Sequence, residues 1–207
     1  MAVDFQIHSL NLDLNELKKD CRRIKNKVTK QYQDSQVPTN KKYQNTLAEQ
    51  LDQAPESSRL HDLYNVFTFP YASIRELYVS LCDIFRYTNP YPHQYYVHAW
   101  LNYQNKGETI PWHYHWKGLS NLDETFVCSY YINAEPSVTT YDYPNSDYQF
   151  DHTTKNNTLS IYEDQGDKHM VHEWTQEDPR ISISMDFVPI HYIQSTPYVL
   201  NTWMPVL

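Results

Sequence analysis

The first part of the chain carries an apolar pattern with helical spacing. Between residues 12 and 30, one apolar residue recurs every three or four positions, at Leu14, Leu17, Cys21, Ile24 and Val28. Asp13 and Glu16 stand at the start of this segment in the arrangement of a capping box. The spacing predicts an amphipathic helix over residues 12–30, followed from Gln31 to Arg59 by a polar loop or a weak helix.

A second apolar stripe with the same spacing follows. Its members are Ile74, Leu77, Tyr78, Leu81 and Phe85. We expect Ser73 and Glu76 to cap this segment and Asn89-Pro90 to end it. The pattern predicts a helix over residues 71–86 that packs on a sheet.

From residue 94 onward the pattern becomes typical of strands, with many Tyr, Val, Ile, Phe and Trp residues. The candidate strands are residues 94–104, 110–116, 126–132, 137–143, 158–163 and 180–188. Helices followed by strands favour a mainly β, α+β architecture over alternating βαβ units.

The last candidate strand has two chemically different faces, because side chains alternate along a strand. One face is apolar and consists of Ile181, Ile183, Met185 and Phe187. The other is polar and consists of Arg180, Ser182, Ser184 and Asp186. If the apolar face packs on the helices, the polar face looks into a pocket or barrel interior. There Arg180 can bind a ligand carboxylate with its bidentate fork.

Composition narrows the possible partners and the cellular compartment. The formal charge of −8 argues against binding to nucleic acid, which requires clustered Lys and Arg. No segment approaches the roughly 20 apolar residues that span a bilayer, so we expect a cytoplasmic protein without a membrane segment. Its three cysteines, Cys21, Cys82 and Cys128, each lie in an apolar stretch and are interpreted as reduced core residues.

Three histidines suggest a metal site. His113 and His115 are two residues apart on a predicted strand and should share a face, and His169 stands eleven residues before Arg180. Imidazole nitrogens suit Fe, Zn, Cu and Ni. His172 is an alternative to His169, although its distance to Arg180 is shorter. We therefore expect three imidazole ligands and one anion-binding arginine.

The order of these residues resembles that of the prolyl-hydroxylase-like 2-oxoglutarate- and Fe(II)-dependent dioxygenases. The motifs that carry the resemblance are Trp100-Leu-Asn102-Tyr, Gly107, His113-x-His115, Ser129-Tyr130-Tyr131, His169-Met-Val171 and Arg180-x-Ser182. The resemblance implies a double-stranded β-helix, a jelly-roll barrel buttressed by N-terminal helices. Residues 1–207 would then form one domain, with helical support at 1–90, the barrel at 94–188 and a C-terminal extension at 189–207.

The resemblance also implies roles for individual residues. His113 would be the first iron ligand and His169 the distal one. Arg180 would bind the far carboxylate of 2-oxoglutarate with Ser182, while Tyr131 and Asn102 would also contact this cosubstrate. With O2, such an enzyme hydroxylates a small molecule or a protein side chain and yields succinate and CO2.

The family normally has a carboxylate where this chain has His115. Three outcomes are open: a three-histidine iron site, a carboxylate recruited from Asp123 or Glu124, or a site that binds metal without hydroxylation.

Two other readings remain. Gly107 with His113-x-His115, and Gly166-x-x-His169, also resemble cupin motifs, but the expected cupin glutamate is missing near Ser120, and Arg180-x-Ser182 is left unexplained. The other reading is a non-catalytic jelly-roll that binds a sugar or a protein.

Overall fold

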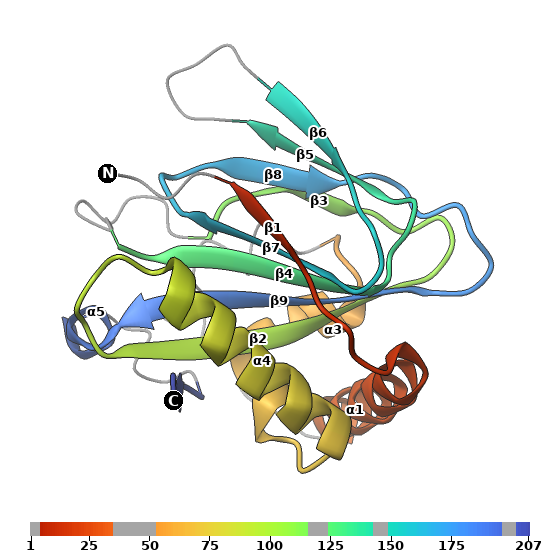
Figure 1. The fold of residues 1–207 in the computed structure, drawn as a ribbon. Helices are drawn as coiled ribbons and strands as arrows, with labels where there is room; N and C mark the ends of the chain where they lie inside the picture. The colour runs from red at the N-terminus through yellow and green to blue at the C-terminus, as the bar shows by residue number, and fades with distance from the viewer. Residues whose placement is uncertain (1–4, 35–52, 116–123, 143–148, 196–201) are drawn as a thin grey trace.

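The computed structural model describes residues 5–34, 53–115, 124–142, 149–195 and 202–207. Two antiparallel sheets face each other (Figure 1). The larger sheet consists, in order, of β1 (Gln6–Ser9), β7 (Thr158–Glu163), β4 (Phe126–Asn133), β9 (Arg180–Pro189), β2 (Tyr95–Gln104) and β10 (Met204–Pro205). The smaller sheet consists of β3 (Ile110–His113), β8 (Lys168–Val171), β5 (Val138–Asp142) and β6 (Gln149–Thr153). This arrangement confirms the mainly β architecture.

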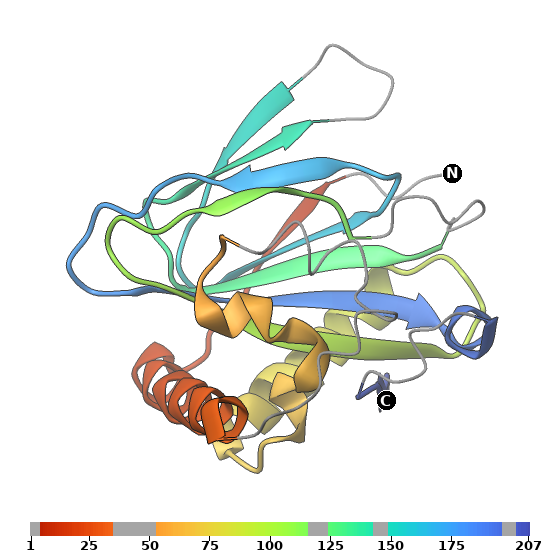
Figure 2. The same ribbon diagram turned by 180° about the vertical axis from the view of Figure 1, so that it is seen from behind.

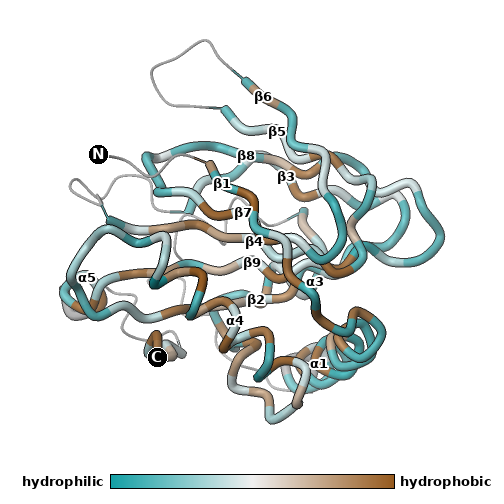
Figure 3. The backbone as a smooth tube through the Cα atoms, viewed as in Figure 1, coloured by the Kyte–Doolittle hydropathy of each residue, from teal (hydrophilic) through white to brown (hydrophobic). Residues whose placement is uncertain are grey.

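Two long helices, α1 (Leu14–Asp34) and α4 (Ala72–Thr88), cover the face of the larger sheet that lies away from the smaller one (Figures 1 and 2). Much of α1 is hydrophilic, whereas the strands beneath it contain long hydrophobic stretches (Figure 3). The short helical elements are α3 (Glu56–Arg59), η2 (His61–Leu63), η3 (Val66–Thr68) and α5 (Ile190–Ser195). Among the described residues, no helix combines the length and the apolar character needed to cross a membrane.

The main core lies between these helices and the larger sheet. It contains apolar residues of both helices together with the apolar face of β9: Ile181, Ile183, Met185 and Phe187. The orientation predicted for this strand is therefore confirmed. Cys21, Cys82 and Cys128 are buried and free of disulfides, and they belong to the same core.

The start of α1 agrees with the sequence only in part. Asp13 accepts hydrogen bonds through Oδ1 from the backbone N–H groups of Asn15 (2.9 Å) and Glu16 (3.2 Å), as expected for an N-cap. The Glu16 carboxylate, however, accepts from Lys19 Nζ at 3.3 Å. The helix is capped by one residue, without the reciprocal bond of a capping box.

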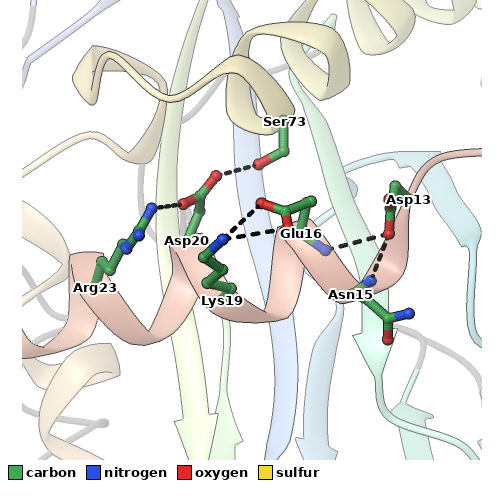
Figure 4. A network of polar contacts seen from close by, with 7 residues as sticks. All are labelled: Asp13, Asn15, Glu16, Lys19, Asp20, Arg23 and Ser73. Atoms are coloured by element: carbon green, nitrogen blue, oxygen red, sulfur yellow. Dashed lines mark hydrogen bonds and ion pairs between the residues drawn. The ribbon is translucent and has the colours of Figure 1, made fainter.

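The cap predicted for the second helix, Ser73 with Glu76, is wrong. Tyr71 is the N-cap residue of α4 and makes no side-chain capping bond. The Ser73 hydroxyl instead donates to Asp20 Oδ2 of α1 at 2.7 Å, while Asp20 Oδ1 accepts from Arg23 at 2.9 Å (Figure 4). A tertiary contact between the two helices therefore uses this hydroxyl.

Several strand boundaries also differ from expectation. The strand predicted over 110–116 ends at His113. β1, β6, β8 and β10 were not predicted from the sequence. Helix α1 extends to Asp34, and α3 occupies part of the stretch from Gln31 to Arg59 that was expected to be a loop or a weak helix. Residues 35–52 of that stretch lie outside the described chain.

Replacing Asp20 by Ala should lower the free energy of unfolding by about 1–3 kcal/mol. The change removes the buried carboxylate that joins the two helices, so Ser73 and Arg23 both lose their hydrogen-bond acceptor. Urea unfolding followed by circular dichroism measures the loss. Glu16→Ala is the matched control, because its side chain is 53% exposed and its ion pair contributes about 0–1 kcal/mol. Equal effects of the two changes would contradict this role for Asp20.

Candidate metal and anion site

The pairing of β3 with β8 brings two histidines together. His113 and His169 stand directly opposite each other in this antiparallel pair. Side chains at such positions share a face, with Cβ atoms about 5 Å apart. The two ring centroids are 4.2 Å apart. Two positions distant in sequence thereby converge on the inner face of the smaller sheet.

His115 completes the cluster from just beyond the end of β3. Its ring stacks on that of His113, with centroids 5.5 Å apart and planes 22° apart. His113, His115 and His169 are all buried, and one ring nitrogen from each lies within 4.8 Å of the others. This cluster of three imidazoles can hold one metal ion.

Hydrogen bonds orient two of the rings. His113 Nδ1 lies 2.8 Å from the Pro111 carbonyl oxygen, and His115 Nδ1 lies 2.5 Å from Asp186 Oδ1. Both acceptors require an N–H at Nδ1, so each ring in its neutral form keeps its lone pair on Nε2. The arrangement is that of metal-binding histidines, whose other nitrogen donates to a carbonyl or a carboxylate.

Two buried ring nitrogens of the cluster lack hydrogen-bond partners among the described residues, which also favours a metal ion. These two atoms are His115 Nε2 and His169 Nδ1. A buried polar atom left unpaired costs about 1–3 kcal/mol, and coordination of a cation removes that cost. The donor set suits Fe, Zn, Cu or Ni.

The pKa values of the three imidazoles are shifted in different directions. Burial, with a further contribution from the charge of His115, lowers the pKa of His113 to about 3. Burial likewise holds the pKa of His169 well below its usual range. Burial would also lower the pKa of His115, but the adjacent Asp186 carboxylate outweighs it and raises that pKa. At neutral pH, His113 and His169 are therefore in the neutral form that binds metals.

Two alternative ligands lie elsewhere. His172 is exposed, and its Nε2 is 2.8 Å from Thr140 Oγ1. The Glu124 carboxylate pairs with His93 Nε2 at 2.9 Å. Asp123 lies outside the described residues. Neither His172 nor Glu124 belongs to the imidazole cluster.

Arg180 lies in the same interior, directly opposite Gln104 of β2, and is 1% exposed. Its Nη1 donates to Gln104 Oε1 at 2.8 Å and to Ser182 Oγ at 2.9 Å. Its Nε donates to Ser137 Oγ at 2.9 Å. Each of these acceptors is neutral, and no described carboxylate forms an ion pair with Arg180.

The guanidinium keeps its charge despite this burial. Burial lowers the pKa of Arg180 to about 10, while nearby Tyr131 and Tyr141 oppose the shift. The Tyr131 ring lies beside it, with its centroid 6.0 Å from Cζ. A buried cation with neutral partners favours an anionic ligand.

One narrow cavity connects the two sites. Its lining residues are Trp100, Asn102, Ile110, His113, Ser129, Tyr131, Thr139, Tyr141, His169, Val171, Arg180, Ser182 and Ser184. The enclosed space is about 20 Å³, which is room for about one water molecule. The residues expected to contact an organic acid, namely Asn102, Tyr131, Arg180 and Ser182, all lie on its wall.

Two residues of this site, Gln104 and Ser137, were not singled out from the sequence, and Asp186 was named only as a member of the polar face of the last strand. Asp186 shares the polar face of β9 with Arg180, and Gln104 shares a face of β2 with Asn102, so strand alternation alone marks both as inward-facing. Ser137 precedes β5, and no local pattern indicates it.

The solved structures that this fold resembles include prolyl hydroxylases. A prolyl hydroxylase from Trichoplax adhaerens, in complex with a peptide fragment of hypoxia inducible factor, is 11% identical with a TM-score of 0.59, over 94% of this chain and 87% of that one. A Pseudomonas putida prolyl-4-hydroxylase is 12% identical with a TM-score of 0.53, over 89% and 92%. The viral collagen prolyl hydroxylase of Paramecium Bursaria Chlorella virus-1 is 10% identical with a TM-score of 0.52, over 90% and 96%.

Other comparisons are weaker. Against three further 2-oxoglutarate-dependent proteins, including the carbocyclase SnoK, the chain spans 54–61% of their length. The sequence matches no protein-family model and no curated protein. The fold is nevertheless the double-stranded β-helix of 2-oxoglutarate- and Fe(II)-dependent oxygenases, as the sequence motifs implied.

Replacing His113 or His169 by Ala should lower the affinity for a divalent metal by more than about 100-fold, because each change removes an imidazole donor. Isothermal titration calorimetry with Co(II) measures the affinity. His172→Ala is the matched control and should bind like the wild type. A large loss in this control, with little loss in His169→Ala, would make His172 the ligand.

Metal binding should release about one proton between about pH 5 and 6.5, since only His115 has a raised pKa in the metal-free cluster. Affinity for Co(II) should therefore fall about tenfold for each pH unit of acidification in this window. Calorimetry in buffers of different ionisation enthalpy counts the protons. Release of three would show that all the rings are protonated before the metal arrives.

Proposed function

We propose that this protein is a 2-oxoglutarate- and Fe(II)-dependent oxygenase that hydroxylates a small molecule or a protein side chain, with succinate and CO2 as the other products. One observation carries the proposal: His113 and His169 of the imidazole cluster line one cavity together with Arg180, a buried arginine without a carboxylate partner among the described residues. A cation site and an anion site in one enclosed space suit a metal and an organic acid that bind together.

The anion site supports a dicarboxylic cosubstrate. Removing a guanidinium from water costs on the order of several kcal/mol unless an opposite charge compensates. Among the described residues, Arg180 donates hydrogen bonds only to neutral oxygen atoms, those of Gln104, Ser182 and Ser137. A carboxylate of 2-oxoglutarate would provide the missing negative charge. Nη2, which makes no hydrogen bond to the described residues, could donate to it.

The protein's own residues would divide the work as follows. His113, His115 and His169 would hold Fe(II), which with O2 supplies the oxidising chemistry when bound. Arg180 and Ser182 would fix the far end of the cosubstrate, while Tyr131 and Asn102 would contact it from the cavity wall. Asn102 is itself held by Ser184 at 2.7 Å and Ser58 at 2.6 Å.

The cavity would have to widen for this function. About 20 Å³ is far less than a five-carbon dicarboxylate occupies. Tyr131 and Tyr141 line the narrow space, and the Tyr131 hydroxyl is 3.0 Å from Ser160 Oγ. A change in these side chains on cosubstrate binding would open the space and exclude water from it.

The donor set favours one alternative, a cupin-type metalloprotein. Three imidazoles without a directly bound carboxylate differ from the two-histidine, one-carboxylate set of many iron(II) oxygenases, and they also suit zinc. Metal analysis of the purified protein, followed by anaerobic addition of Fe(II) and then 2-oxoglutarate, separates the two. A charge-transfer absorbance that requires both additions supports the oxygenase. Tight zinc with no effect of 2-oxoglutarate supports the alternative.

Replacing Gln104 by Glu should weaken 2-oxoglutarate binding by about tenfold or more and leave Co(II) affinity unchanged, because it places a carboxylate of nearly identical shape against Arg180. Calorimetry of the Co(II)-loaded protein measures both. Gln176→Glu makes the same chemical change at an exposed position and is the control. Unaltered cosubstrate affinity in Gln104→Glu would remove Arg180 from the proposed binding site.

A further inference from the structure

Asp186 is a buried carboxylate that the proposed function has not used. It lies on β9, on the same face as Arg180, and only 6% of its surface is exposed. Its Oδ1 accepts a hydrogen bond from His115 Nδ1 at 2.5 Å. The His115 side chain, which belongs to the histidine cluster, is itself almost fully buried. This contact therefore exists in an environment where water does not compete for it.

The position of Asp186 bears on the charge of the metal site. Iron(II) oxygenases with a two-histidine, one-carboxylate set carry a negative charge directly on the metal. In this chain His115 takes the third place, so the ligands themselves are neutral when they bind. Asp186 is the carboxylate that a ligand ring touches, and its charge lies one side chain away from the ion.

The contact also determines which nitrogen faces the cluster. A carboxylate accepts from Nδ1–H, which leaves the lone pair of the neutral His115 ring on Nε2, a buried atom without a partner among the described residues. His113 receives the equivalent orientation from the backbone carbonyl of Pro111. His115 is thus oriented by a side chain, and substitution can vary that side chain.

We propose that Asp186 is a positioning residue of the metal centre. It holds Nε2 of His115 toward the ion, and it supplies through the imidazole the negative charge that a directly bound carboxylate would carry. The inference rests on the metal-binding part of the proposed function and is independent of 2-oxoglutarate.

Two substitutions separate orientation from charge. In Asp186→Asn the amide oxygen can still accept from Nδ1–H, so the ring stays oriented while the charge is lost. In Asp186→Ala both are lost. Asp83→Asn removes an exposed carboxylate on α4, remote from the cluster, and is the control for net charge.

The experiment is a titration of the full-length, metal-free protein with Co(II), followed by the visible absorbance of the bound ion. We expect affinity to fall about tenfold in Asp186→Asn and about 100-fold in Asp186→Ala, within the range known for such outer partners. We also expect the Co(II) bands of Asp186→Asn to shift, because a less basic imidazole changes the ligand field. Asp83→Asn should match the wild type in both.

The outcomes are distinct. Wild-type affinity and unshifted bands in a folded Asp186→Asn protein would overturn the charge role, and the same result in Asp186→Ala would overturn the orientation role. A loss of stability without any change in the bands of the loaded protein would make Asp186 merely structural. If the wild type itself binds no Co(II), the metal site of the proposed function fails, and this inference fails with it.

Discussion

The complete burial of strand β9 on both of its faces is the constraint on which the rest of the structure depends. On one face, Phe187 stacks on Phe85 of helix α4, with centroids 4.2 Å apart. On the other face stand Arg180 and Asp186. A slip of one residue would exchange the two faces. Continuous pairing with β2, and pairing with β4 that is interrupted only between Tyr131 and Asn133, oppose such a slip. The site therefore inherits its geometry from the hydrophobic core.

The interior of the barrel is electrostatically polarised along this strand. At one end the Arg180 guanidinium is surrounded by neutral oxygens, and at the other the Asp186 carboxylate contacts an imidazole of the histidine cluster. The positive end attracts anions, and the negative end favours a cation. Serine and tyrosine hydroxyls line the space between them. This distribution of charge suits the two ligands of the oxygenase proposal, because the metal and the organic acid have opposite signs.

Local patterns predicted those features that depend on local chemistry. Both long helices, and six strands near their expected positions, follow from periodicity. The His113-x-His115 motif supplies two of the three imidazoles that lie together in the structure. Strand β8 was missed, because only Met170 and Val171 in it are apolar, and it exists through its pairing with β3 and β5. The prediction that Ser73 caps its helix was wrong for a similar reason, since its hydroxyl donates a hydrogen bond to Asp20 of another helix. Contacts between distant segments leave no trace in a short window of sequence.

The three buried cysteines matter in a barrel proposed to host a strong oxidant. Burial raises the pKa of Cys21, Cys82 and Cys128, so each stays a thiol at neutral pH. Thiolates, rather than thiols, react readily with peroxide and related species. Cys128 sits beside cavity-lining Ser129 on β4 but belongs to the core on the helical side of the sheet. Strand alternation thus keeps this thiol on the helical side of the sheet, behind the wall of the cavity, where a reactive species formed in the cavity would not meet it directly.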